Sequence, residues 1–119
     1  MAQFNPAHRI TLFLPVNDPR EQRAAAIVAA AVRSMFPGST QTRFDPAPLT
    51  GYWVEEGADV IYTDDIALVF VDVEDAVVTA AALETSVSKL REAMFAAYAG
   101  VGSPQAEVWI VQEALAVYR

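Results

Sequence analysis

The strongest constraint on the fold is the segment from Ile66 to Val73, IALVFVDV, which is apolar at almost every position. In an extended strand, alternate side chains point to opposite faces of the sheet. Ile66, Leu68 and Phe70 therefore line one face, while Ala67 and the three valines line the other. Because a strand that is apolar on both faces is buried on both faces, this segment predicts a central strand covered from two sides.

Negative charge surrounds this central strand. The stretch from Gly51 to Asp75 holds eight carboxylates and no Lys or Arg, and the chain as a whole has a net charge of −7. We expect no nucleic-acid partner, because binding to nucleic acid needs a basic surface. An acidic surface can simply keep the protein soluble, or it can meet a basic protein, a cation or an unlike patch of a second copy.

Two helices are predicted, one on each side of this central strand in the sequence. Asp18 and Pro19 are typical of the cap and first position of a helix, and Glu21 is placed to reach back as in a capping box. Pro37 ends this helix. Leucine, valine and methionine then recur at helical spacing between 79 and 99 and predict a second amphipathic helix.

The remaining extended segments complete a recognisable order of elements. We expect strands over 9–15, 39–44 and 106–119, and a hairpin over 52–62. Strand, helix, strand, strand, helix, strand is the ferredoxin-like βαββαβ pattern. The sequence therefore predicts a single α+β domain over residues 1–119, with a four-stranded antiparallel sheet, two helices on one face and an extra hairpin.

The face of the sheet away from the helices is also expected to be apolar. If Ile10, Leu12 and Leu14 face the helices together with the valines of the central strand, six other large side chains share the open face. If exposed, these side chains would form an apolar patch of roughly several hundred Å², and a patch of this size usually marks an interaction site. A symmetric dimer buries the same patch twice. We therefore predict a homo-oligomer, with a dimer favoured, whose interface contains Phe13, Ile66, Leu68, Phe70, Trp109 and Val111.

A ligand pocket is the alternative use of the polar and aromatic side chains. Aromatic walls with a few polar groups are typical of ligand sites, although the same side chains also serve packing and interfaces. Trp109 is a further candidate for orienting a ligand, and Asp72 can equally pair with Arg43 or lie at the rim of the sheet. The candidate pocket residues are Arg43, Tyr52, Trp53, Tyr62, Asp65 and Asp72.

The tip of the predicted hairpin carries Glu55, Glu56 and Asp59. These three carboxylates form a candidate surface for a basic partner. The alternatives are that they only solubilise the hairpin, or that the acidic surface imitates nucleic acid and blocks a basic protein.

Other kinds of site find little support in the sequence. Asp64, Asp65 and Asp72 could gather around Mg²⁺ or Ca²⁺, but no metal-binding motif is present, and we predict neither a metal nor a cofactor. His8 is the only histidine and is expected at the surface. The absence of cysteine predicts a cytoplasmic protein, and the absence of a run of about 20 apolar residues predicts no membrane partner.

The layout resembles the ferredoxin-like proteins of the dimeric α/β-barrel group. The resemblance rests on RITLFLP at 9–15, the alanine-rich helix ending in FPG at 36–38, Gly51-Tyr52-Trp53 and IALVFVDV. Short uncharacterised bacterial proteins with an F-P-G helix end and a G-x-W hairpin are similar too. The resemblance implies a dimer or higher oligomer. Members of the group include cofactor-independent monooxygenases and regulatory or ligand-sensing modules, but no catalytic motif matches, so no catalytic residue is assigned.

These observations favour one function and leave a second open. We expect a small cytosolic interaction or regulatory module that associates through its apolar sheet face. The alternative is a small-molecule-binding protein, or a cofactor-independent enzyme of the dimeric α/β-barrel type. The sequence does not decide whether the protein is an enzyme.

Overall fold

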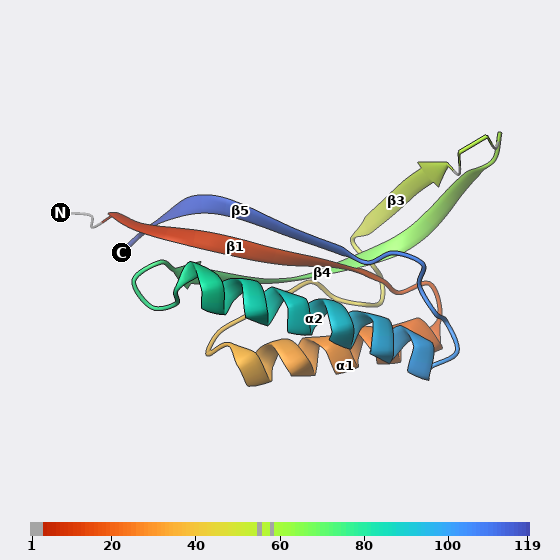
Figure 1. Ribbon diagram of the computed structural model, residues 1–119. Coiled ribbons are helices and arrows are strands. Elements are labelled where there is room, and N and C mark those ends of the chain that lie inside the picture. The colour runs from red at the N-terminus through yellow and green to blue at the C-terminus, as the bar shows by residue number, and fades with distance from the viewer. Residues whose placement is uncertain (1–3, 55, 58) are drawn as a thin grey trace.

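The protein is an α+β structure of two helices and one five-stranded antiparallel sheet. A computed structural model describes residues 4–54, 56–57 and 59–119. Both helices lie side by side against one face of the sheet, and the other face carries no helix (Figure 1). The elements are β1 (Phe4–Pro15), α1 (Pro19–Met35), β2 (Thr40–Gln41), β3 (Leu49–Val54), β4 (Ile61–Glu74), α2 (Ala80–Gly100) and β5 (Trp109–Tyr118).

The sheet has the order β2-β4-β1-β5, and β3 pairs with β4 as well. β2 and β3 occupy successive parts of the same edge of β4, because Thr40 lies opposite Phe70 and Leu49 lies opposite Ile66. The prediction of four strands is therefore wrong. The chain after α1 supplies two short strands to that edge instead of one, and the predicted strand over 39–44 shrinks to two residues.

The inner strands are longer than their apolar patterns indicate. β1 starts at Phe4 instead of Arg9, because Phe4 pairs with Tyr118 at the far end of β5. Pro6 cannot donate a backbone hydrogen bond, but its carbonyl accepts one from the amide of Asp75 at 3.0 Å. Long-range pairing extends this strand into a segment whose composition gives no strand signal.

The hydrophobic core lies between the sheet and the two helices. Ile10, Leu12 and Leu14 are fully buried on β1, and Val69 and Val71 are buried beside them on β4. This confirms which side of each strand faces the helices. The helices contribute small and medium side chains to the same core, including Ala24, Ala25, Val28 and Val32 from α1 and Leu83, Leu90 and Met94 from α2.

The start of α1 follows the predicted capping chemistry, with one change. The Asp18 carboxylate accepts the amide of Glu21 at 2.9 Å. This hydrogen bond, followed by the contact with Arg20, lowers the pKa of Asp18. Glu21 does not return to the amide of the cap. Its carboxylate is buried and accepts the backbone amide of Asn17, one residue earlier, at 3.0 Å.

A β-ribbon made of β3 and the beginning of β4 projects from the body of the molecule (Figure 1). We call this ribbon, Leu49–Val54 with Val60–Asp65, the arm. The radius of gyration is 15.6 Å, whereas a compact domain of this length has about 13.5 Å. The arm and the long central strands account for this larger radius of gyration. In the single chain, the arm therefore packs against no other element on much of its surface.

Candidate functional site

The open face of the sheet is apolar over the middle of β1, β4 and β5. Phe13 lies between Leu68 and Trp109 in the sheet register, and the next row of this face places Phe70 and Val111 on either side of Thr11. Trp109 is 64% exposed in the single chain. The side chains predicted to form an interface therefore share one surface, and Ile66 extends that surface toward the arm.

The arm adds a second apolar surface next to this face. Trp53 stacks on Tyr62 with ring centroids 4.7 Å apart, which fixes the two rings relative to each other. Large apolar side chains are nevertheless exposed on both sides of the ribbon, including Tyr52 at 73%. The exposed set is Leu49, Tyr52, Trp53, Val54, Val60, Ile61 and Tyr62.

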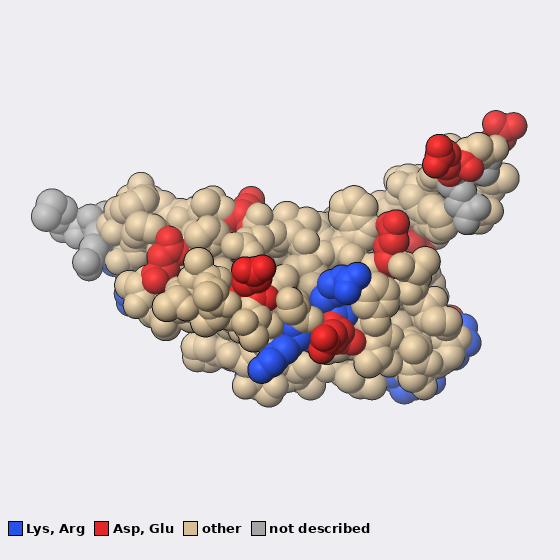
Figure 2. All heavy atoms as spheres, in the orientation of Figure 1, with Lys and Arg blue, Asp and Glu red and all other residues tan. Residues whose placement is uncertain are grey.

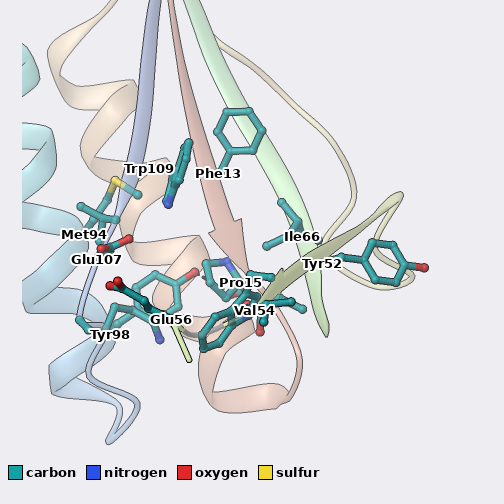
Figure 3. Close-up of a pocket in the computed structure, with 16 residues that line it drawn as sticks. Phe13, Pro15, Tyr52, Val54, Glu56, Ile66, Met94, Tyr98, Glu107 and Trp109 are labelled. Atoms are coloured by element: carbon teal, nitrogen blue, oxygen red, sulfur yellow. Dashed lines mark hydrogen bonds between the residues drawn. The ribbon is translucent and has the colours of Figure 1, made fainter. Parts of the chain in front are cut away.

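A hollow of about 670 Å³ opens where the arm meets the body. Phe13, Trp109 and Ile66 line it from the sheet, and Met94 and Tyr98 line it from α2 (Figure 3). In Figure 3 Trp109 faces Phe13, whereas the ring of Tyr52 points outward, away from the hollow. The hollow thus joins the sheet, the second helix and the arm.

The hollow exists because β1 and β5 separate after Phe13 and Trp109. Pairing between β1 and β5 ends at Phe13 and Trp109, but β1 continues to Pro15 along β4. Beyond Phe13 no strand of the described residues follows the β5 side of β1, and the hollow lies there above the buried side chains of Met94 and Tyr98. Pro15 has no amide hydrogen to leave unpaired, and its carbonyl accepts the hydroxyl of Tyr98 at 2.6 Å.

A chain of hydrogen bonds holds the arm to the body beneath the hollow. Trp53 Nε1 donates to Asp64 at 3.2 Å, and Asn17 Nδ2 donates to the other oxygen of Asp64 at 2.9 Å. Asn17 Nδ2 also donates to Glu21 at 2.8 Å, and Ser103 donates its hydroxyl to Glu21 at 2.7 Å. The amide of Asn17 therefore bridges two carboxylates, one in the arm and one in α1.

Burial raises the pKa of the Tyr98 hydroxyl well above its ordinary value, and the charges of Glu21 and Asp64 raise it further. The folded protein therefore holds this proton more tightly than the unfolded chain does. The resulting stabilisation is complete below the ordinary tyrosine pKa of about 10 and is lost as the pH rises above it.

Replacing Tyr98 with Phe tests both roles of this hydroxyl. We expect Tyr98→Phe to lower the free energy of unfolding by about 1–2 kcal/mol at neutral pH, because the Pro15 carbonyl loses its donor. Above about pH 10 the stability of the variant should fall less steeply than that of the natural protein. Urea unfolding across this pH range measures both effects. Tyr52→Phe, at an exposed position, is the control, and equal alkaline slopes for Tyr98→Phe and the natural protein would contradict this account.

Asp72 pairs with Arg9, and Arg43 is not its partner. Arg9 Nε and Nη2 donate to the two Asp72 oxygens at 2.7 and 3.0 Å, and the guanidinium lies 4.4 Å from the centre of the Phe70 ring. The sheet register places Arg9 directly opposite Asp72, and opposite charges at such cross-strand positions attract each other. The alternative that Asp72 bonds Arg43 is therefore wrong.

The candidate pocket residues do not gather at one place. Tyr52 and Trp53 line the hollow, and Tyr62 reaches it indirectly through its stacking on Trp53. Arg43 is exposed between β2 and β3, and the described residues include no partner for it. The Asp65 side chain is exposed, and its backbone amide donates to the Asn17 side chain.

Of the acidic residues predicted at the hairpin tip, Glu56 also borders the hollow. Glu56 and Asp59 are both exposed, and Figure 2 shows negative charge at the end of the arm. Glu55 lies outside the described residues. Within residues 4–54, 56–57 and 59–119, no group of three acidic or histidine side chains is placed to hold a metal ion, including the aspartates 64, 65 and 72.

Several residues of the hollow have no clear signal in the sequence. Glu107 is the main example, since it lies in a loop before β5 and reaches the hollow only because the chain turns back there. Met94 and Tyr98 fit the helical core pattern, so periodicity alone assigns them to packing. The one available hint is Pro15, since a proline that ends an inner strand leaves a place where pairing stops.

Comparison with models of known protein families gave no match, and comparison with curated protein sequences gave none either. In the part of the chain that the structure describes, neither helix has the length and apolar character needed to cross a membrane.

Proposed function

We propose that this protein is a small self-associating interaction or regulatory module, whose open sheet face and arm hold a second copy. The observation that carries the proposal is the set of exposed apolar side chains on the open sheet face, such as Trp109 and Val111, and on the adjoining arm. A single chain leaves that surface in water, whereas a two-fold dimer covers it on both copies at once.

We infer that the fold is ferredoxin-like, which fits this proposal. The order β5-β1-β4, with β2 and β3 sharing the outer edge of β4, corresponds to a βαββαβ sheet whose second strand is divided in two. The helices cover one face, so the other is free to pack against a partner (Figure 1). A cytoplasmic location belongs to the same proposal and is supported by the cysteine-free composition.

The available area explains why the arm belongs to the proposed interface. β1 and β5 pair from Phe4–Tyr118 to Phe13–Trp109. With three strands across, this gives a face of about 500 Å². A stable interface covers about 800 Å² on each partner, so the sheet face alone is too small. At roughly 100 Å² each, the three or four exposed apolar side chains on one side of the arm bring the total to about 800–900 Å².

Light scattering behind a sizing column tests self-association. We expect the natural protein to have twice the mass of one chain across a dilution series, and Leu68→Arg to have the mass of one chain, because the new charge lies in the centre of the apolar face. Ile27→Arg is the matched control, since Ile27 is 54% exposed on α1 and faces away from the sheet.

A second substitution keeps this test informative if Leu68→Arg does not fold. Val111→Arg places the same charge at a more accessible position, where 39% of the valine is exposed. A single-chain mass for the natural protein, or a dimer that survives both substitutions in folded protein, would rule out the sheet face as the interface.

The acidic tip of the arm is proposed as a second contact, for a basic protein. It is supported by the exposure of Glu56 and Asp59 and by the absence of Lys and Arg from residues 44–88. Once a partner is identified, charge reversal at these two positions should weaken its binding. Unchanged binding would remove the tip from the proposal.

The hollow favours a second candidate function, the binding of a small molecule. Its volume of about 670 Å³ lies within the usual range of about 300–1,000 Å³ for ligand sites. A thermal-shift screen against small metabolites tests this function, because a ligand that binds only the folded protein must stabilise it. No shift with any compound would count against it.

A further inference from the structure

We infer that the hollow beside Pro15 is a binding site for an organic cation that carries an aromatic or apolar body. This inference rests on the second candidate function, small-molecule binding, and does not require self-association. Phe13, Ile66 and Trp109 of its lining also belong to the proposed interface.

The walls of the hollow suit an apolar or aromatic body. Phe13, Ile66 and Trp109 offer apolar surface from the sheet (Figure 3). Most ligand sites combine such walls with a few polar groups that fix orientation. Here the polar groups decide the charge of the ligand.

The charged residues of the lining are all acidic. They are Glu56, Asp64 and Glu107, and the lining includes no Lys, Arg or His. Asp64 is occupied by Trp53 and Asn17. Glu56 and Glu107 both line the hollow, and neither has a hydrogen-bond or ion-pair partner among the described residues. An anion would be repelled there, whereas a cation gains two free carboxylates.

The aromatic side chains add a second attraction for positive charge. Both tryptophans of the chain, Trp53 and Trp109, line the hollow. The face of an indole ring attracts cations more strongly than the face of any other side chain. Trp53 is already fixed by its hydrogen bond to Asp64 and by its stacking on Tyr62. Its side chain therefore loses little conformational entropy when a ligand binds.

The same geometry favours an organic cation over a metal ion. Mg²⁺ and Ca²⁺ need several oxygen ligands converging on one point. The described residues contain no such group of acidic side chains, in the hollow or elsewhere. An organic ammonium ion needs no such converging ligands. Its charge can contact a carboxylate of the lining while its apolar body packs against the tryptophan rings.

Three probes of similar shape separate charge from apolar fit. Benzylamine is a cation at pH 7, benzyl alcohol is neutral and benzoate is an anion. Because both tryptophans line the hollow, the intrinsic fluorescence of the protein reports occupancy. We expect saturable binding of benzylamine, about tenfold weaker binding of benzyl alcohol and no saturable response to benzoate. Added salt should weaken the binding of benzylamine and leave that of benzyl alcohol unchanged.

Two paired variants locate the charge. Glu56→Gln with Glu107→Gln should reduce benzylamine affinity to that of benzyl alcohol. Glu84→Gln with Glu92→Gln changes the net charge equally on exposed positions of α2 and should leave affinity within a factor of two. Both pairs are at exposed positions, so folding should persist.

The outcomes distinguish this inference from the other proposals. Equal responses to the three probes, no saturable response to benzylamine, or equal losses in the two paired variants would overturn the cation site. A single-chain mass with tight benzylamine binding would leave the cation site standing and remove self-association. If benzyl alcohol binds alone, small-molecule binding survives and the inference about charge does not.

Discussion

Leu12→Ala should lower the free energy of unfolding by about 3 kcal/mol. Leu12 is fully buried on the inner strand β1, where it lies opposite Val69 on one side and Ile110 on the other, beneath the helices. Removing three carbon atoms from such a place loses their burial and leaves a cavity that rigid neighbours fill only in part. Urea unfolding at one fixed protein concentration measures the change, since self-association would otherwise add to it.

Val77→Ala is the control for this measurement, because Val77 is 73% exposed and its truncation should change stability by less than about 0.5 kcal/mol. A loss below about 1 kcal/mol for Leu12→Ala would mean that the space between sheet and helices is not closely packed.

Glu21→Ala is expected to cost about 3 kcal/mol as well, for a different reason. The buried Glu21 carboxylate accepts the backbone and side-chain amides of Asn17 and the hydroxyl of Ser103. Alanine leaves these donors without their acceptor, and a buried donor without a partner costs the full loss of its hydration. Glu21→Gln keeps one acceptor oxygen and should cost less, about 1–2 kcal/mol.

A second readout of Glu21→Ala reaches the arm. Asn17 connects Glu21 to Asp64, which holds the indole of Trp53. Tryptophan fluorescence should therefore change in Glu21→Ala and stay the same in Glu92→Ala, where the replaced glutamate is exposed. If Glu21→Ala and Glu21→Gln are equally stable and leave the fluorescence unchanged, the hydrogen-bond chain does not position the arm.

Local chemistry made the core and the first helix predictable. Alternation along Ile66–Val73 identifies the buried valines, and the Asp18-Pro19 pair identifies the start of α1. Both signals are carried by residues close together in sequence. The α+β class and the antiparallel sheet follow from the order of such elements, and the structure confirms them.

The errors concern contacts between distant segments. Arg43 and Arg9 are equally plausible partners for Asp72 until the register of β1 and β4 is known. The shortening of the predicted strand over 39–44 to β2, and the joining of the predicted hairpin to the sheet through β3, depend on how two short segments share the edge of β4. Glu107 joins the hollow for the same kind of reason. Which remote segments pair depends on all strands of the sheet together. The periodicity of a single segment therefore cannot predict its partner.

The position of β1 in the sheet also determines how the protein can be made. β1 is made before the other elements described here, yet its two neighbours are β4 and β5, and Phe4 can meet Tyr118 only after all of those elements have been made. During that interval Ile10, Leu12 and Leu14 have no core to enter, and both edges of the strand are unpaired. After α1, the chain that follows, residues 44–88, carries ten carboxylates and no Lys or Arg. Repulsion between these carboxylates therefore keeps incomplete chains apart while β1 is still unpaired.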